Sequence, residues 1–183
     1  MSNKPKLLLH VCCAPCATYP IKLLQEEYEV ELLFYNSNIQ PEEEYRARLK
    51  EARQYAHKLG VKLHELDYDA DMWFRAVRGL ESEPEGGCRC EVCYRIRLGR
   101  TARFAVAGGF DKFTTTLSIS PHKDTRAINK IGRMIGGMYM LDFYAADFKK
   151  NDGFKKSTQM SEESGLYRQN YCGCVYSKKN KKK

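Results

Sequence analysis

The chain is organised around one stretch, Leu7-Leu-Leu-His10-Val-Cys12-Cys13-Ala-Pro-Cys16-Ala-Thr-Tyr19. Its apolar run over residues 7–11 predicts a buried β-strand. Thr18, Tyr19 and Pro20 then offer an N-cap and a first-turn proline for a helix over residues 21–27. The three cysteines therefore fall at a strand-to-helix turn, where backbone N–H groups and the helix dipole favour thiolates. Because thiolates ligate metals and attack disulfides, we expect this turn to form the floor of an active site.

Strands and helices alternate along the rest of the chain. Further strands are predicted over residues 30–35, 61–66, 112–117 and 139–144. Helices are predicted over residues 41–59, 69–80, 90–107, 124–135 and 154–164, and glycines follow the ones that end at 59, 107 and 135. This alternation predicts an α/β fold with a parallel five-stranded sheet and helices on both faces. We expect a single domain over residues 1–177 and a basic C-terminal tail over residues 178–183.

Thiol-bearing and polar segments follow the predicted strands. Cys12, Cys13 and Cys16 follow the first strand, and the loop that begins at Asn36 follows the second. Residues 118–122 follow the fourth strand, and Asp147 follows the fifth. In parallel sheets, ligands bind outside the carboxyl ends of the strands. We therefore expect these segments to converge on one edge of the sheet.

The chain has 183 residues and a formal net charge of +8, to which the tail contributes five lysines. Basic residues also recur within the fold, as Arg95, Arg97, Arg100, Arg103, Lys123, Arg126, Lys130 and Arg133. This pattern fits a polyanionic partner, and it fits a solvated helix face equally well.

No stretch approaches about 18 consecutive apolar residues, so we expect no transmembrane helix and no membrane partner. The first predicted strand leaves no room for a signal peptide, so we expect a cytoplasmic protein. In a reducing compartment, cysteines point to metal or redox chemistry rather than to structural disulfides. The eight cysteines fall into three clusters, which are Cys12, Cys13 and Cys16, then Cys88, Cys90 and Cys93, then Cys172 and Cys174.

Three kinds of site are compatible with these clusters. A structural zinc site would use four cysteines, but its pairs would lie about 75 residues apart, against roughly 15–20 in a compact zinc ribbon. A thioredoxin-type dithiol is suggested by Cys13-Ala-Pro-Cys16, but it leaves Cys12 and the Cys90/Cys93 pair without a role. A [4Fe–4S] cluster takes four thiolates and tolerates ligands from distant segments, so the number and clustering of the cysteines favour it.

The two later clusters have spacings of their own. Cys90 and Cys93 are three residues apart, so on a helix both sulfurs face the same side and suit two corners of a metal or cluster site. Cys172 and Cys174 are too close for ordinary chelation alone. A Cys-x-Cys disulfide is strained, and strained disulfides are labile, so the pair is a candidate for redox chemistry. Further metal ligands stay the alternative for these two cysteines.

A set of separate motifs runs in order through residues 7–177: Cys12-Cys13-Ala-Pro-Cys16, Tyr35-Asn-Ser-Asn-Ile, Glu44-Tyr45, Cys90-x-x-Cys93-Tyr-x-x-Arg-Leu98, Thr115-Thr-Leu-Ser-Ile-Ser-Pro121, Asp147-Phe-Lys-Lys and Tyr167-Arg-Gln-Asn-Tyr-Cys-Gly-Cys174-Val-Tyr-Ser. In these motifs the chain resembles the QueH-type epoxyqueuosine reductases. The resemblance implies a sheet similar to that of the PP-loop/HUP enzymes. It also implies an oxidoreductase that reduces epoxyqueuosine to queuosine at the wobble position of tRNA. The glycine-rich pyrophosphate loop of PP-loop enzymes is absent, which argues against the use of ATP.

The same resemblance implies roles for individual residues. Cys12, Cys13, Cys90 and Cys93 would be the ligands of a [4Fe–4S] cluster, and Cys172/Cys174 the redox-active pair. Cys88 is an extra cysteine of this sequence. The implied partners are a tRNA with a GUN anticodon that carries epoxyqueuosine, and an electron-donor protein.

The chemistry requires a general acid that protonates the leaving epoxide oxygen, and a Lewis acid that binds it. Asp147, His122 and His10 are the candidate acids, although a packed strand histidine is the simpler interpretation of His10. The Lewis acid would be cluster iron, or a second metal ion, taken as iron, that is held by Cys16 with a carboxylate such as Asp147. Two alternative functions remain open at this point, a zinc-bearing tRNA-binding module without redox activity and a thiol–disulfide oxidoreductase.

Overall fold

The computed structural model describes residues 4–179 and contains a five-stranded sheet. The strands are β1 (Lys6–Val11), β2 (Glu29–Phe34), β3 (Leu63–Glu65), β4 (Lys112–Thr115) and β5 (Asp142–Phe143). Their order across the sheet is β3-β2-β1-β4-β5, and every neighbouring pair is parallel. The predicted fold class is therefore confirmed.

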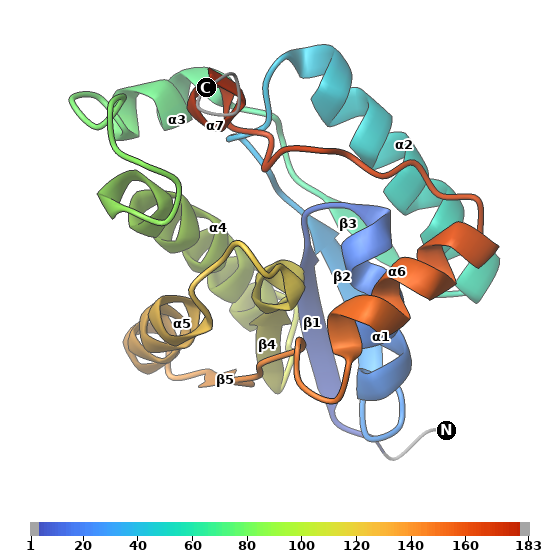
Figure 1. The fold of residues 1–183 in the computed structure, drawn as a ribbon. Helices are drawn as coiled ribbons and strands as arrows, with labels where there is room; N and C mark the ends of the chain where they lie inside the picture. Colours follow the sequence, from blue (N-terminus) through green and yellow to red (C-terminus); the bar gives the residue numbers. More distant parts are fainter. Residues whose placement is uncertain (1–3, 180–183) are drawn as a thin grey trace.

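Helices cover both faces of this sheet (Figure 1). One face carries α1 (Ala14–Leu24), α2 (Glu42–Leu59) and α6 (Gly153–Glu163), and the other carries α4 (Cys88–Ala107) and α5 (Thr125–Tyr139). The short helices α3 (Ala70–Ala76) and α7 (Val175–Lys179) and the 3-10 helix η1 (Thr116–Ile119) lie toward the carboxyl ends of the strands (Figure 1).

The core follows from the alternation of side chains along the strands. In β1, Leu7, Leu9 and Val11 pack with α1 and α2, whereas Leu8 points to the opposite face and packs with α4 and α5. All four side chains are buried, as expected for a parallel sheet covered on both sides. A third, smaller cluster joins α3, α4 and the C-terminal segment through Trp73.

Several element boundaries differ from the sequence-based expectation. α1 begins at Ala14 rather than at residue 21, because Pro15 occupies the first turn, so Cys16 lies inside the helix. α5 continues through Gly136 and Gly137 to Tyr139, and Met140 ends it at a φ of 50°. β5 is correspondingly shortened to two residues. η1 lies where a strand end and a loop were expected, and α7 was not foreseen. Of the predicted tail, residues 180–183 lie outside the described residues.

The C-terminal segment, residues 164–174, returns from α6 across the carboxyl edge of the sheet to α7 (Figure 1). Arg48 of α2 fastens it by donating hydrogen bonds to the carbonyl oxygens of Tyr171 and Cys172, each over 3.1 Å. Gly173 adopts a φ of 110°, and its carbonyl accepts a hydrogen bond of 2.8 Å from the backbone of Gln40. These contacts bring the last two cysteines to the same edge as the first three.

Candidate active site

The strand ends and the helix starts that follow them place thiols at one edge of the sheet. Cys12 and Cys13 follow β1 directly, and Thr116 follows β4. Cys90 and Cys93 come from the first turns of α4, while Cys172 and Cys174 come from the C-terminal segment. The predicted convergence on the carboxyl edge is thus found for Cys12, Cys13 and Cys16, for the loop that begins at Asn36 and for residues 118–122, but Asp147 lines neither cavity of this edge. Cys90, Cys93, Cys172 and Cys174 join them at the same edge.

The first group consists of Cys12, Cys13 and Cys16, called here the β1 thiols. Their sulfur atoms all lie within 4.8 Å of one another. The Sγ atom of Cys12 lies 3.8 Å from that of Cys13 and 3.7 Å from Thr116 Oγ1. Gln169 of the C-terminal segment donates a hydrogen bond of 2.9 Å from its amide Nε2 to Cys13 Sγ. Three sulfurs at this separation form a donor set that suits a metal ion.

The β1 thiols share one readily formed negative charge. Hydrogen bonding with Cys13 and Cys16 holds the pKa of Cys12 well below its ordinary value. The hydrogen bond with Cys12 raises the pKa of Cys13 to about 12, and hydrogen bonds with both neighbours raise the pKa of Cys16. Cys12 is therefore the thiolate of the group, and the other two would ionise when a cation binds.

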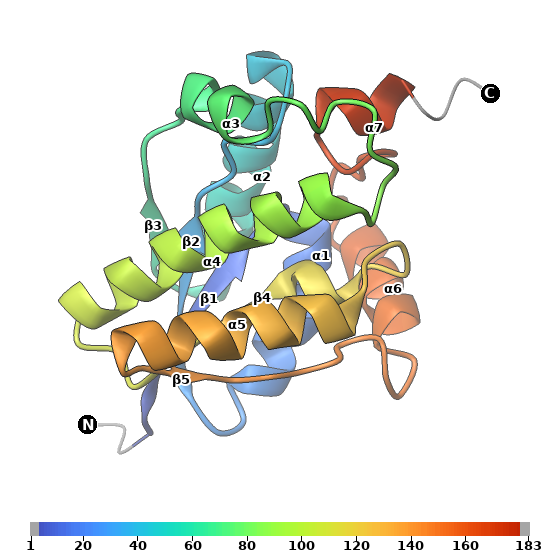
Figure 2. The same cartoon turned by 90° about the vertical axis from the view of Figure 1, so that its left-hand side faces the viewer.

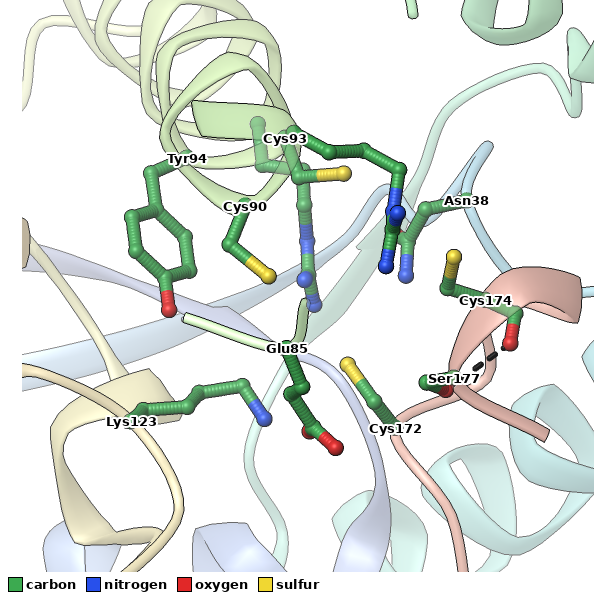
Figure 3. Close-up of a pocket in the computed structure, with 11 residues that line it drawn as sticks. Asn38, Glu85, Cys90, Cys93, Tyr94, Lys123, Cys172, Cys174 and Ser177 are labelled. Atoms are coloured by element: carbon green, nitrogen blue, oxygen red, sulfur yellow. Dashed lines mark hydrogen bonds between the residues drawn. The ribbon is translucent and has the colours of Figure 1, made fainter. Parts of the chain in front are cut away.

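The second group consists of Cys90, Cys93, Cys172 and Cys174, called here the α4–C-terminal thiols. They line a narrow cavity of about 10 Å³ together with Asn38, Glu85 and Lys123 (Figure 3). Trp73 donates a hydrogen bond of 2.9 Å from Nε1 to Cys93 Sγ, and the backbone N–H of Gly86 donates one of 3.2 Å to Cys90 Sγ. Burial raises the pKa of Cys93 to about 12. All eight cysteines are free thiols.

A larger cavity of about 260 Å³ adjoins the narrow one. The sulfur-bearing residues Cys12 and Cys16 line it, together with His122 and Gln169. Three residues line both cavities, namely Glu85, Lys123 and Cys172. Figure 3 shows these three side chains pointing toward one another between the thiol-bearing elements. The volume is close to the lower end of the range of about 300–1,000 Å³ that is usual for small-ligand sites.

Two cations beside the thiols have no carboxylate partner among residues 4–179. Arg97 is buried, with 3% of its surface exposed, and donates a hydrogen bond of 2.7 Å to Asn36 Oδ1. Burial works against the charge of Lys123, but its Coulombic interactions with Cys172 and Cys12 raise its pKa. A buried cation without a counter-ion is costly, so this edge of the sheet favours an anionic ligand set or an anionic ligand.

The other predicted site residues lie in different surroundings. Asp147 lines neither cavity, and its carboxylate lies 3.6 Å from the ammonium of Lys149. His10 is fully buried, with Nε2 3.1 Å from the carbonyl of Tyr35 and Nδ1 2.9 Å from Thr115 Oγ1, and burial lowers its pKa to about 3. It is the packed strand histidine that the sequence favours.

Cys88 is exposed and lines neither cavity. The catalytic and ligand roles expected for Asp147 and for the individual cysteines stay predictions.

The loop after β2 contains two asparagines that differ in their hydrogen bonds, Asn36 and Asn38. The amide of Asn36 is fully used, because Nδ2 donates to the carbonyl of Val11 and Oδ1 accepts from Arg97. Asn38 Oδ1 is buried at the narrow cavity and has no hydrogen-bond partner among the described residues, and the same holds for Gln169 Oε1 at the larger one. Two unsatisfied acceptors suit N–H or O–H groups of a bound molecule.

Sequence reasoning did not assign site roles to Gln169, Trp73, Glu85 or Lys123. Gln169 lies in a motif that the sequence singles out, but its contact with Cys13 crosses most of the chain. Lys123 is visible in the sequence only as one member of a basic series. Spacing alone therefore could not separate it from the exposed cations of α5.

A family model described as epoxyqueuosine reductase QueH matches residues 7–180. The epoxyqueuosine reductase QueH of Streptococcus pyogenes serotype M1 is 45% identical over 184 residues, which cover 97% of this chain and 72% of the relative. That of Thermotoga maritima is 37% identical over 174 residues, which cover 93% of this chain and 89% of the relative.

Among solved structures, the chain is similar to the U34-tRNA thiolase NcsA from Methanococcus maripaludis with its [4Fe-4S] cluster. The TM-score is 0.61 at 11% identity, with 97% of this chain and 63% of the other covered. It is also similar to a predicted subunit of tRNA methyltransferase from Methanocaldococcus jannaschii, with a TM-score of 0.56, 11% identity, and 90% and 93% of the chains covered. At this identity the likeness shows the fold alone, and it agrees with the expected PP-loop/HUP-type sheet.

Over residues 4–179, no helix has the length and apolar character needed to cross a membrane. The family match spans nearly the whole chain, and the relatives match it from end to end. The resemblance that the cysteine motifs carry is thereby confirmed, and the chain belongs to the epoxyqueuosine reductase QueH family.

Proposed function

We propose that this chain is an oxidoreductase of tRNA modification that reduces epoxyqueuosine to queuosine at the wobble position of tRNA. In this reaction both C–O bonds of the epoxide break, a C=C bond forms, and the oxygen leaves as water. The balance requires a two-electron reductant and two protons. Membership of the QueH family supports the proposal, since the match covers residues 7–180.

One observation carries the proposal. Six thiols line two adjoining cavities, and the Sγ atom of Cys13 lies beside those of Cys12 and Cys16. Arg97 and Lys123 lie at the same cavities without carboxylate partners in the described part of the chain. A thiolate-ligated cluster is anionic, so the donor set and the buried cations both fit it. Within this set, we assign Cys12, Cys13, Cys90 and Cys93 as ligands of a [4Fe–4S] cluster. When bound, the cluster would supply electrons one at a time.

The remaining thiols and polar groups have roles around that centre. Cys172 and Cys174 are proposed as the redox-active pair, and Cys16 as a ligand of a second iron. His122 lines the larger cavity and is the candidate general acid with the best access to it. The catalytic role of Asp147 stays a prediction. No contact with a thiol cavity supports it, and its carboxylate lies next to Lys149.

The proposed partners are a tRNA with a GUN anticodon and an electron-donor protein. The larger cavity is open to a flipped-out base, and the unsatisfied Oε1 of Gln169 would accept a hydrogen bond from it. The cytoplasmic location stays a prediction.

The experiment is anaerobic purification followed by iron and sulfide analysis and by conversion of epoxyqueuosine tRNA, read by nucleoside mass spectrometry. The Cys90→Ala variant should lose iron and activity, because the face of α4 offers no replacement sulfur at that position. The matched control is Cys88→Ala, which removes an exposed thiol outside both cavities and should change neither readout. A colourless wild-type protein that holds zinc, or full iron in Cys90→Ala, would contradict the assignment.

A further inference from the structure

Charge is distributed unevenly along this chain. Residues 88–139, which contain α4 and α5, carry ten Lys and Arg against three Asp and Glu. Residues 1–87 carry eleven against fifteen. Because α4 and α5 cover the same face of the sheet, the excess of positive charge is concentrated on one side of the molecule.

The cations on that side are exposed and unpaired. Six exposed residues form what we call the α4–α5 basic face: Arg95, Arg100, Arg103, Arg126, Lys130 and Arg133. None of them forms an ion pair within the described residues, whereas Arg46, Arg48 and Arg53 of α2 each have a glutamate partner. The one carboxylate at the start of α5, Asp124, accepts hydrogen bonds from the backbone of Arg126 and Ala127 as an N-cap.

The α4–α5 basic face begins at the thiol cavities. Cys90, Cys93 and Tyr94 of α4 line the narrow cavity, and His122 and Lys123 line the larger one just before α5 begins. Figure 2 shows α4 and α5 side by side with their first turns at the same end. From Arg126 to Arg133 the basic face extends roughly 10 Å along the helix axis, at about 1.5 Å per residue.

We propose that the α4–α5 basic face binds phosphates of the tRNA anticodon arm that flank the wobble nucleotide. This inference rests on the proposed function, which requires that nucleotide to reach the thiol edge. The phosphates on either side of it must then lie over a surface that borders the cavities. On the α2 side the first turn carries Glu42, Glu43 and Glu44, and its arginines Arg46 and Arg48 are paired with two of these, so that side offers no comparable set of cations without carboxylate partners among the described residues.

The composition of the face favours RNA over an acidic protein partner. Five of its six cations are arginines, whose planar guanidinium matches a phosphate with two parallel hydrogen bonds. A protein interface has a core depleted of charge and built from apolar anchors. On the first halves of α4 and α5, next to the thiol cavities, the large exposed side chains are charged, whereas the exposed apolar side chains Val106, Met134 and Met138 lie in the second halves of the helices, away from the cavities.

The test compares two triple variants of the full chain. The first is Arg95→Gln, Lys130→Gln and Arg133→Gln, which removes three exposed cations from the face. The control is Lys50→Gln, Lys58→Gln and Lys155→Gln, which removes the same charge from exposed positions of α2 and α6. The probe is unmodified tRNA with a GUN anticodon, titrated at several salt concentrations, and iron content and thermal unfolding are measured alongside.

We expect the first variant to bind tRNA at least about tenfold more weakly near 0.1 M salt, with a salt slope smaller by roughly 2–3. The control should stay within about twofold of the wild type, and iron should be unchanged in both. Equal weakening by both variants, or an unchanged slope in the first, would overturn the proposal. The proposal would also be overturned if the first variant bound tRNA like the wild type and lost turnover only when a protein supplied the electrons. That result would assign the α4–α5 basic face to the electron donor. Wild-type protein that binds tRNA through this face but does not reduce epoxyqueuosine would instead contradict the proposed function.

Discussion

At the scale of single residues, Arg97 distinguishes this site from an ordinary core. Its guanidinium is buried and makes a side-chain hydrogen bond to Asn36 Oδ1, and its Nε has no partner in the described structure. A lone buried cation is tolerated only if something nearby carries negative charge. The thiolates of the adjacent cavity are the groups that can do so.

The Arg97→Met variant should therefore retain less iron than the wild type, because the thiolates lose their nearest buried cation. The iron-free variant should be at least as stable as the iron-free wild type, since an uncompensated charge has been removed. Arg97→Lys keeps the charge and should retain most of the iron. Iron analysis after anaerobic desalting and thermal unfolding of both forms check this. Full iron in Arg97→Met, combined with a large loss of stability, would assign Arg97 to structure alone.

At the scale of elements, the C-terminal segment depends on α2. Arg48 is buried, pairs with Glu44 over 2.7 Å and donates to two carbonyl oxygens of the segment. The same helix carries a second Arg–Glu ion pair, between Arg46 and Glu42. This pair is exposed and makes no hydrogen bond to another element within the described residues. Variants of the two arginines therefore distinguish the loss of an ion pair from the loss of the hydrogen bonds that hold the C-terminal segment.

Arg48→Met should release residues 171–174, because both carbonyl oxygens lose their donors. Hydrogen exchange of amides in this segment should accelerate, while amides of β1 and β2 keep their protection. Arg46→Met should change neither, since an exposed i,i+4 pair contributes only about 0.3–0.5 kcal/mol. Unaltered exchange at residues 171–174 in Arg48→Met would show that Gln40 and Tyr171 hold the segment without it.

Gly153 and Gly137 differ in the space around them, so their alanine variants test how tightly α6 and α5 are packed. A Cβ on Gly153 at the start of α6 would lie 1.8 Å from the backbone oxygen of Phe148, whereas one on Gly137 of α5 meets nothing within 4 Å. Gly153→Ala should therefore destabilise the protein by about 3 kcal/mol or more, since backbone must move. Gly137→Ala should stabilise it by about 0.5–1 kcal/mol. Urea unfolding measures both, and a neutral Gly153→Ala would mean that α6 can shift along α1.

Single-sequence reasoning was most successful for the centre of the sheet. The apolar runs of β1 and β2 predict buried strands, and the cysteines after β1 predict the thiol edge. It failed where tertiary contacts decide. α5 passes its two glycines because Gly136 lies against the backbone of Leu141 and leaves only two residues for β5. The contacts of Gln169 with Cys13 and of Trp73 with Cys93 join distant segments, and no local pattern encodes them.

At the scale of the whole molecule, thiols lie at all three clusters of the core: Cys16 packs against the first, Cys12 and Cys90 pack against the second, and Cys93 and Cys174 belong to the third. The β1 thiols belong to the sheet and α1, while the α4–C-terminal thiols belong to α4 and the C-terminal segment. Iron bound across the two groups would link all of these elements. Because such a ligand set is complete only in the folded chain, binding contributes to the stability of the fold.

Anaerobic removal of iron with a chelator should therefore lower Tm by at least about 5 °C, since 1 kcal/mol corresponds to about 2–4 °C at this size. Hydrogen exchange should increase in residues 88–93 and 171–174 and remain slow in β1, β2 and β4, whose packing is mainly aliphatic and aromatic, with Cys12, Cys16 and Cys90 only partly buried against it. Restoring iron and sulfide should reverse both changes. Identical Tm values with and without iron would mean that the metal binds to one group of thiols only.

The crossing of the C-terminal segment over the sheet edge also orders events during synthesis. Cys12 leaves the ribosome before the rest of the sheet is made, whereas Cys172 and Cys174 follow only after the sheet-forming part of the chain, a delay on the order of ten seconds at typical translation rates. During that interval the nascent chain holds the β1 thiols without the segment that later covers them. Assembly of a metal centre that needs both groups of thiols would therefore follow the emergence of Cys172 and Cys174 from the ribosome.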